Sequence, residues 1–170
     1  QLSFTAPTKT YGGSALSGEL TYHVYVNTDA PLTGKVNAGS SAVVPVQARE
    51  GMNTFVVTLS NAAGASPKAR LSAYAGYDTP KSVDKLTLSV DAARRADLTW
   101  TAPTATEHGG FLGTLTYDLI RITGTDTTQV ANGISDVHFS EVLPEGPLMG
   151  YRYAVRAHNQ SQVTTWTNSN

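Results

Sequence analysis

The chain of 170 residues has no cysteine, little charge and no long apolar run. Without cysteine there is no disulfide framework and no Cys-based metal site, so a small domain here depends on its hydrophobic core. Twelve Lys and Arg balance thirteen Asp and Glu, a net charge of −1. Nucleic-acid binders and polybasic membrane modules need clustered cations, so we expect no nucleic-acid partner. No stretch approaches the roughly 20 apolar residues of a membrane span, so we expect no membrane insertion.

Motifs for catalysis or cofactor binding are also missing. The four histidines, at positions 23, 108, 138 and 158, are far apart, and no HExxH, DxDxDG, GxSxG or GxxxxGK pattern occurs. The acidic residues form no evident general acid–base pair. We therefore expect no catalytic residue, no metal site and no cofactor, and we predict that the chain is not an enzyme.

The composition favours β-strands. Val, Ile, Thr, Tyr, Phe and Trp make up 55 of the 170 residues, and Thr alone contributes 23. Apolar and polar residues alternate, as in residues 20–27, where Tyr22, Val24 and Val26 share one face. Period-2 alternation indicates strands buried on one side, as in an antiparallel sandwich, and no stretch has a helical period. The sequence predicts an all-β fold.

The second half of the chain repeats the first, with offsets of 95 to 98 residues. Such a repeat, with small changes in loop length, indicates tandem domains, which we place at residues 1–78 and 79–170 with a linker near 76–81. The repeated blocks are LSFTAPT at 2–8 with LTWTAPT at 98–104, the glycine pairs 12–13 and 109–110, LTYHV at 20–24 with LTYDL at 115–119, and FVVTLSN at 55–61 with YAVRAHN at 153–159.

The order L-x-W-x-A-P, Gly-rich loop, L-T-Y-x-L and Y-x-Y-x-V-x-A-x-N resembles the fibronectin type III family. This resemblance implies two tandem immunoglobulin-like β-sandwiches of about seven strands each. It places Trp100 in the second core, with Phe4 at the matching position of the first. It also makes Tyr151 a tyrosine corner, whose place in the first domain is taken by Asn53. The Ala-Pro-Thr and Gly-Gly motifs are similar to those of modules in secreted or surface Bacteroidetes-type bacterial proteins.

The first domain lacks its opening strand. In the second half, residues 85–90 supply a strand A ahead of strand B at 96–101, but in the first half strand B begins at Leu2. Without strand A, one edge of strand B has unpaired backbone groups. We expect the chain to be a fragment of a longer multi-module protein.

Exposed aromatic residues are the first candidates for contacts. Phe111 and Leu112 follow the glycine pair in the loop between the second and third strands of the second domain. In the resembled fold this loop faces the preceding module, so an inter-module contact with Tyr77 or Met52 is expected. The alternatives are a contact with a ligand and ordinary packing within the loop.

A second candidate is a patch on the outer face of the larger sheet of the second domain. Alternation places Ile120 and Ile122 beside Arg152 and Arg156, and Trp166 on the last strand can stack on an arginine. Apolar residues flanked by arginines suit a binding surface. The alternative is that the arginine stems cover the isoleucines and nothing binds.

Residues 126–128, Asp-Thr-Thr, resemble an O-glycosylation signal of secreted Bacteroidetes-type proteins, with Thr127 as the acceptor, although they are equally explained as a plain loop. The sequon at Asn159 is better explained by a structural hydrogen bond of that asparagine.

We expect a non-catalytic extracellular module pair that serves as a spacer and a protein or glycan interaction surface, adhesive in character, in a larger bacterial surface or secreted protein. Its partners would be an unknown protein or glycan ligand and neighbouring domains of the parent chain. The alternative is an accessory stalk of a secreted glycoside hydrolase or protease, whose catalytic domain lies outside this chain.

Overall fold

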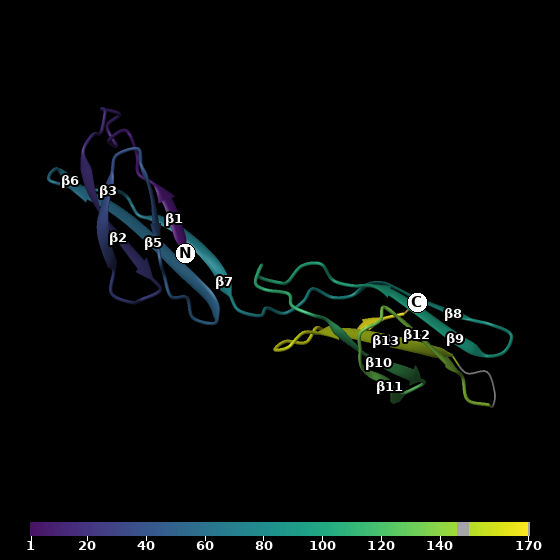
Figure 1. Cartoon of the computed structure of the whole chain (residues 1–170). Coiled ribbons are helices and arrows are strands. Elements are labelled where there is room, and N and C mark those ends of the chain that lie inside the picture. Colours follow the sequence, from purple (N-terminus) through teal and green to yellow (C-terminus); the bar gives the residue numbers. More distant parts are fainter. Residues whose placement is uncertain (146–149, 170) are drawn as a thin grey trace. The chain divides into compact units, whose positions relative to one another are not determined.

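The computed structural model describes residues 1–145 and 150–169, and within them the regular elements are all strands (Figure 1). The chain divides into two compact units, Gln1–Ala75 (unit 1) and Gly76–Asn170 (unit 2). The sequence placed the change of domain after residue 78. In the structure the Gly76 carbonyl and the Asp78 N–H are both hydrogen-bonded to the backbone of Phe111, within unit 2. No helix in the described part is long and apolar enough to cross a membrane.

Unit 1 is a sandwich of a small and a larger antiparallel sheet. Strands β1 and β4 pair in the small sheet, and the larger sheet has the order β3-β2-β5-β6, with β7 also pairing with β5. The strands are β1 (Leu2–Thr5), β2 (Glu19–Val26), β3 (Leu32–Asn37), β4 (Ser41–Val44), β5 (Gly51–Asn61), β6 (Gly64–Ala65) and β7 (Ala69–Ala75).

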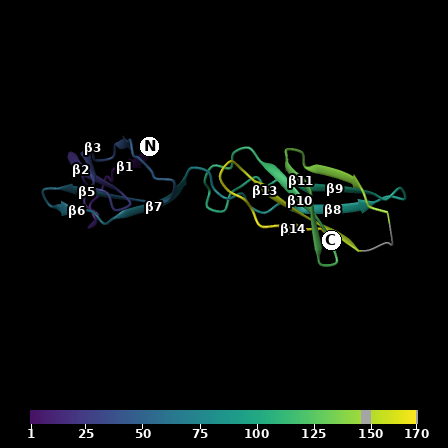
Figure 2. The same cartoon turned by 90° about the horizontal axis from the view of Figure 1, so that it is seen from below.

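Unit 2 repeats this plan with one strand more in its smaller sheet. That sheet has the order β12-β9-β8, and the larger has the order β11-β10-β13-β14. Strands β8 and β9, which pair in the smaller sheet, are labelled side by side in Figure 2. The strands are β8 (Asp84–Val90), β9 (Arg95–Thr101), β10 (Thr116–Thr123), β11 (Asp126–Ile134), β12 (His138–Val142), β13 (Tyr151–His158) and β14 (Thr167–Asn168).

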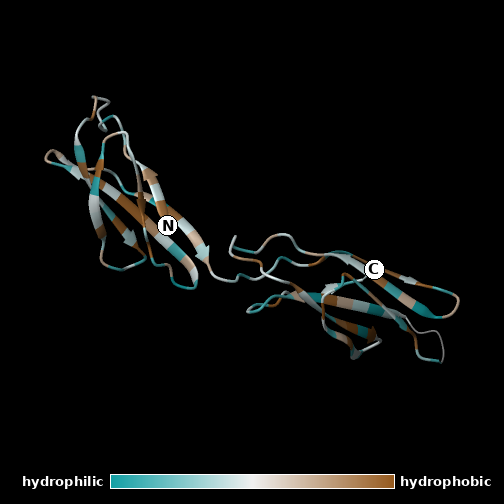
Figure 3. Cartoon of the chain, in the orientation of Figure 1, coloured by the Kyte–Doolittle hydropathy of each residue, from teal (hydrophilic) through white to brown (hydrophobic). Residues whose placement is uncertain are grey.

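The predicted all-β class, with two tandem sandwiches, is confirmed. The small sheets differ in strand number: β9 lies between β8 and β12, whereas its counterpart β1 pairs with β4 as its only partner among the described strands. Apolar and polar residues alternate along the strands of both units, as Figure 3 shows. The inward-facing apolar residues form the cores.

One aromatic pair occurs in both cores. In unit 2 the Trp100 and Tyr117 rings meet edge to face with centroids 5.3 Å apart, and in unit 1 Phe4 and Tyr22 do the same at 5.6 Å. Each pair joins the smaller sheet to the larger one, which is where the sequence repeat placed these residues. The indole Nε1 of Trp100 is buried and has no hydrogen-bond partner among the described residues.

The corner position of unit 1 has no tyrosine hydroxyl, as the resemblance implied. Asn53 stands where the second domain has Tyr151, yet it makes its own contacts with the preceding loop. Its amide is 1% exposed; Nδ2 donates to the carbonyls of Arg49 (2.7 Å) and Gly51 (2.8 Å), and Oδ1 accepts from the Arg49 backbone N–H (3.0 Å). Asn27 donates a further bond of 2.9 Å to Oδ1. An amide network therefore holds this corner.

Candidate functional site

The outer face of the larger sheet of unit 2 carries the predicted patch. In the register of β10 and β13, Ile122 lies opposite Arg152, and Asp118 lies opposite Arg156. Both isoleucines of the patch are half-buried and Arg152 is exposed. These residues therefore share one face of the sheet, as the alternation predicted.

Arg156 is the centre of this face. Its guanidinium lies 4.6 Å from the ring centroid of the half-buried Trp166, within cation–π distance. Two of its nitrogens, Nε and Nη2, also donate to one carboxylate oxygen of Asp118, at 3.1 and 2.9 Å. Arg156 is thus held in place by an acid and an aromatic ring. Arg152 remains as the exposed cation of the patch.

Asp118 lies on the same face of the sheet, opposite Arg156. It is 5% exposed and, besides Arg156, it accepts from the Gly133 backbone N–H at 3.0 Å and pairs with His158 Nε2 at 3.3 Å. Burial alone raises the pKa of Asp118, but the bonds from Gly133 and Arg156 and the nearby charge of His158 outweigh it and lower the pKa below its usual value. The carboxylate is therefore ionised, and both of its oxygens have hydrogen-bond partners.

A shallow cavity of about 310 Å³ adjoins this cluster, between the strand side chains and the loop that follows β13. Seven of its eight lining residues have polar side chains, and the described residues hold no group of three or more His, Cys, Asp and Glu side chains able to bind a metal ion. The arrangement offers hydrogen bonds and one aromatic ring. That chemistry suits contacts to a polar partner surface such as a peptide or a sugar. The lining residues are Asp118, Arg156, His158, Asn159, Gln160, Ser161, Gln162 and Val163.

A second polar cluster, at the start of unit 2, was missed by sequence analysis. Asp78 is 0% exposed, and its carboxylate accepts from His108 Nδ1 (2.9 Å), from the His108 backbone N–H (2.6 Å) and from the Gly110 backbone N–H (3.2 Å). Its carbonyl accepts from Asn159 Nδ2 at 2.9 Å. Asp78 therefore ties the first residues of unit 2 to two of its loops. The available sequence signal was a histidine directly before the second glycine pair.

The carboxylate of Asp78 makes the stability of unit 2 depend on pH. Burial by itself raises the pKa of Asp78, but the hydrogen bonds from the His108 side chain and backbone and from Gly110 hold it well below the ordinary value of 3.8. A group whose pKa is lower in the folded state stabilises the fold above its unfolded pKa, and that stability is lost as pH falls towards the folded pKa.

We expect Asp78→Asn to lower the melting temperature of unit 2 by several degrees at neutral pH, because the single amide oxygen cannot accept the four N–H bonds that the two carboxylate oxygens accept. The difference from the unchanged protein should shrink as pH falls from about 4 to about 2, because the carboxyl of Asp78 becomes protonated in the unfolded chain while it stays ionised in the folded one. Thermal unfolding of both proteins across this pH range measures it. Glu107→Gln, an exposed acid-to-amide change in the same loop, is the control. A difference that stays constant with pH would contradict the role of the carboxylate.

Phe111, Leu112 and Tyr77 are brought together within unit 2. The rings of Tyr77 and Phe111 lie 5.2 Å apart, and their backbones form an isolated parallel bridge. The carbonyl of Leu112 accepts from Asn159 Nδ2 at 2.9 Å. Phe111 is nonetheless 63% exposed, so packing on Tyr77 leaves part of the ring in contact with solvent. Met52 lies on β5 of unit 1 and is 54% exposed.

Thr127 lies on a strand, not in a plain loop. It is the second residue of β11, is exposed, and pairs with Ile122. The chain reverses direction before this strand, around Gly124, whose φ of +60° lies in the left-handed region that glycine favours. Thr127 remains a predicted modification site, accessible at the sheet edge.

No protein-family model matches the chain, and the search of curated proteins finds no match. Solved structures do match. A two-domain fibronectin type III segment of chicken tenascin is 10% identical over 99% of this chain and 94% of its own length, with a TM-score of 0.42. A Fn3-like protein from Clostridium thermocellum is 22% identical over 54% of this chain and 91% of its own, with a TM-score of 0.41.

Domains A168–A170 of titin are 16% identical over 99% of this chain, with a TM-score of 0.47. This chain spans 64% of the length of that titin segment, and 17% of a longer structure containing the titin kinase and its flanking domains. These are proteins to which the chain is similar in fold. The two-sandwich architecture itself rests on the strand pairing described above.

Proposed function

We propose that the chain is a non-catalytic module pair that serves as a spacer and as an interaction surface for a protein or glycan, in a larger bacterial surface or secreted protein of the adhesive type. The location proposed is extracellular, in keeping with the resemblance to secreted Bacteroidetes-type modules. The observation that carries the interaction role is the outer face of unit 2, where Trp166 and Arg156 lie next to each other.

Several features of this face support a binding role. The ring of Trp166 is half-buried and Arg152 is exposed, so an aromatic surface and a cation are both accessible. The pairing of Arg156 with Asp118 fixes the stacked guanidinium before any partner arrives, which lowers the entropy lost on binding. Tryptophan and arginine are also the residues that most often dominate interface energies.

The proposal is tested by screening the full chain against arrays of glycans and extracellular matrix proteins. We expect a saturable signal that is lost in Trp166→Ala and weakened in Arg152→Glu. Tyr25→Ala and Arg70→Glu make the same kinds of change in unit 1 and should leave the signal intact. A protein that binds nothing on either array, or whose signal is unaffected by Trp166→Ala, would contradict this surface as the interaction site.

A further inference from the structure

An asparagine followed by a glycine occurs once in the sequence, at positions 132 and 133. The register between β10 and β11 shifts at this place, so that Asn132 and Gly133 together lie opposite the single residue Asp118 of β10. Gly133 has a φ of +65°, in the left-handed region. Both residues are exposed, and β11 is the edge strand of its sheet. Solvent water therefore reaches this pair of residues.

An asparagine before a glycine can react with its own backbone and then with water. The backbone nitrogen of Gly133 attacks Cγ of Asn132 and closes a succinimide ring. The Cγ–Nδ2 bond breaks, and ammonia leaves with the proton of the attacking nitrogen. Water then opens the ring at either carbonyl, which gives aspartate or isoaspartate and adds a negative charge. Glycine favours this reaction because it has no Cβ to hinder the approach of its nitrogen.

The nitrogen that has to attack is held by Asp118. The Gly133 N–H donates to Oδ1 of Asp118 at 3.0 Å. For the attack this nitrogen has to turn toward the side chain of Asn132, which breaks the bond. The carboxylate is itself fixed, because Arg156 donates to its other oxygen at 2.9 and 3.1 Å. A hydrogen bond to a charged acceptor is stronger than a neutral one, so it keeps the nitrogen in its place in the strand.

Asp118 is also a poor base for removing the proton of this N–H. Burial raises the pKa of Asp118, but the hydrogen bonds from Gly133 and Arg156 outweigh it and lower the pKa below its usual value. A carboxylate with a lowered pKa is a weak proton acceptor at neutral pH. The contact therefore holds the nitrogen in its unreactive, protonated form.

We propose that Asn132 is a deamidation site that Asp118 keeps in the amide form, and that conversion to aspartate or isoaspartate follows when the bond between Gly133 and Asp118 opens. Isoaspartate lengthens the main chain by one atom, so the bulge no longer places the Gly133 N–H against the carboxylate. The change runs in one direction, because the ammonia is lost to solvent. It does not depend on whether the outer face of unit 2 binds a partner.

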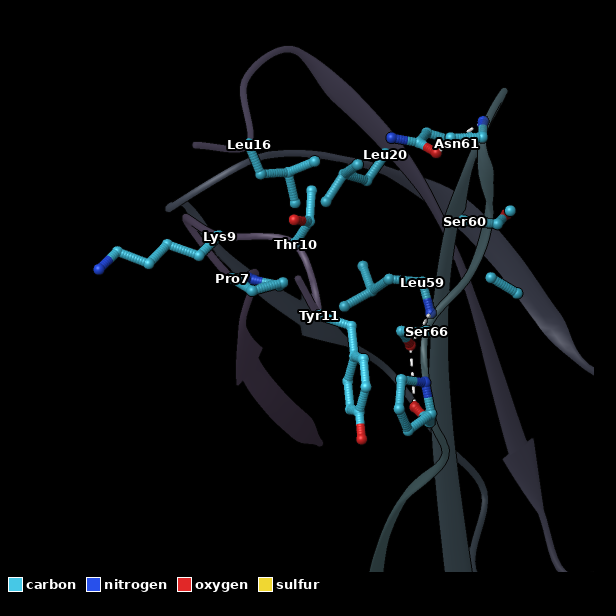
Figure 4. A pocket seen from close by; sticks show the side chains of 14 residues that line it. Pro7, Lys9, Thr10, Tyr11, Leu16, Leu20, Leu59, Ser60, Asn61 and Ser66 are labelled. Carbon is cyan, nitrogen blue, oxygen red and sulfur yellow. Dashed lines mark hydrogen bonds between the residues drawn. The ribbon is translucent and has the colours of Figure 1, made fainter. Parts of the chain in front are cut away.

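Two other asparagines serve as controls within the chain. Asn61, at the end of β5 beside a cavity of unit 1, is exposed but is followed by an alanine (Figure 4). Its Oδ1 accepts from the Ala63 N–H at 2.9 Å. Asn168 in unit 2 is also exposed, and the nitrogen that follows it, on Ser169, donates to the Tyr153 carbonyl at 2.7 Å. Conversion at Asn168 therefore reports a general opening of unit 2.

The test incubates the full chain at neutral pH and body temperature for several weeks. Mass spectrometry then measures aspartate and isoaspartate at each asparagine, and a synthetic peptide of residues 128–136, TQVANGISD, gives the rate of the unfolded segment. We expect Asn132 to convert about tenfold or more slowly in the folded chain than in the peptide. Asp118→Ala should raise the rate in the chain by about tenfold, the equivalent of one charge-assisted hydrogen bond. Asp118→Asn keeps an oxygen acceptor and should give an intermediate rate.

A rise at Asn132 that is absent at Asn61 and Asn168 would support the proposal. Three results would each overturn it. The first is conversion of Asn132 as fast in the folded chain as in the peptide, and the second is an unchanged rate at Asn132 in both variants of Asp118. The third is equal acceleration at Asn132 and Asn168 in both variants, which would show that loosening of unit 2 as a whole controls the reaction.

Discussion

Replacing Asn53 with alanine is expected to destabilise unit 1 by about 2–4 kcal/mol. The buried amide makes four hydrogen bonds: two with Arg49 in the loop before β5, one with Gly51 at the start of β5 and one with Asn27. Alanine removes all four, so the loop groups that faced the amide lose their partners in a region largely closed to water. Hydrogen exchange measured by mass spectrometry reports the two units separately and gives the free energy of opening for unit 1.

Two controls define what this result means. Asn53→Leu keeps roughly the same volume without the hydrogen bonds, so it should be nearly as unstable if the bonds matter more than the packing. Asn37→Ala, an exposed asparagine of the same sheet, should change the free energy by less than about 0.5 kcal/mol. A small effect of both Asn53 variants would show that the corner is held by something other than the amide.

Replacing Trp100 with alanine is expected to cost unit 2 about 3–5 kcal/mol, the usual range for a large aromatic residue in a core. Trp100 is 5% exposed and packs edge to face on Tyr117, so the variant loses both buried area and the ring contact. The same exchange measurement should show the loss in peptides of unit 2 and leave those of unit 1 protected.

Trp100→Phe is the informative comparison. Phe4 shows that phenylalanine meets the facing tyrosine in the same edge-to-face manner in unit 1. The indole Nε1, which has no partner among the described residues, is removed at the same time. We therefore expect a loss of less than about 1.5 kcal/mol for this variant. A loss as large as that of Trp100→Ala would mean that the indole shape itself is required.

Much of the fold could be predicted because β-sandwich signals are local. Alternation along residues 20–26 and 153–157 identifies which side chains point inward, and the repeat then assigns both aromatic pairs to corresponding strands. The outer face of unit 2 was predictable for the same reason: Ile122 and Arg152 follow from strand parity alone.

The polar contacts could not be predicted in this way. Asp78 lies in a stretch that the sequence treated as a linker, and its partners, His108 and Asn159, come from loops 30 and 81 positions away. The pairing of Asp118 with the Gly133 backbone also requires an irregular register between β10 and β11. Loop conformation and register depend on contacts between distant segments, which no local pattern encodes.

The sequence by itself determined the strand class, the two-domain plan and the inward-facing residues, since each follows from period-2 patterning repeated along the chain. Only the tertiary structure decided that Asn53 holds a corner and that Asp78 is a buried acid whose carboxylate accepts hydrogen bonds from His108. The physical reason is that the burial of a polar group depends on which loops contact one another in the folded chain. These contacts are determined by the packing of the whole domain.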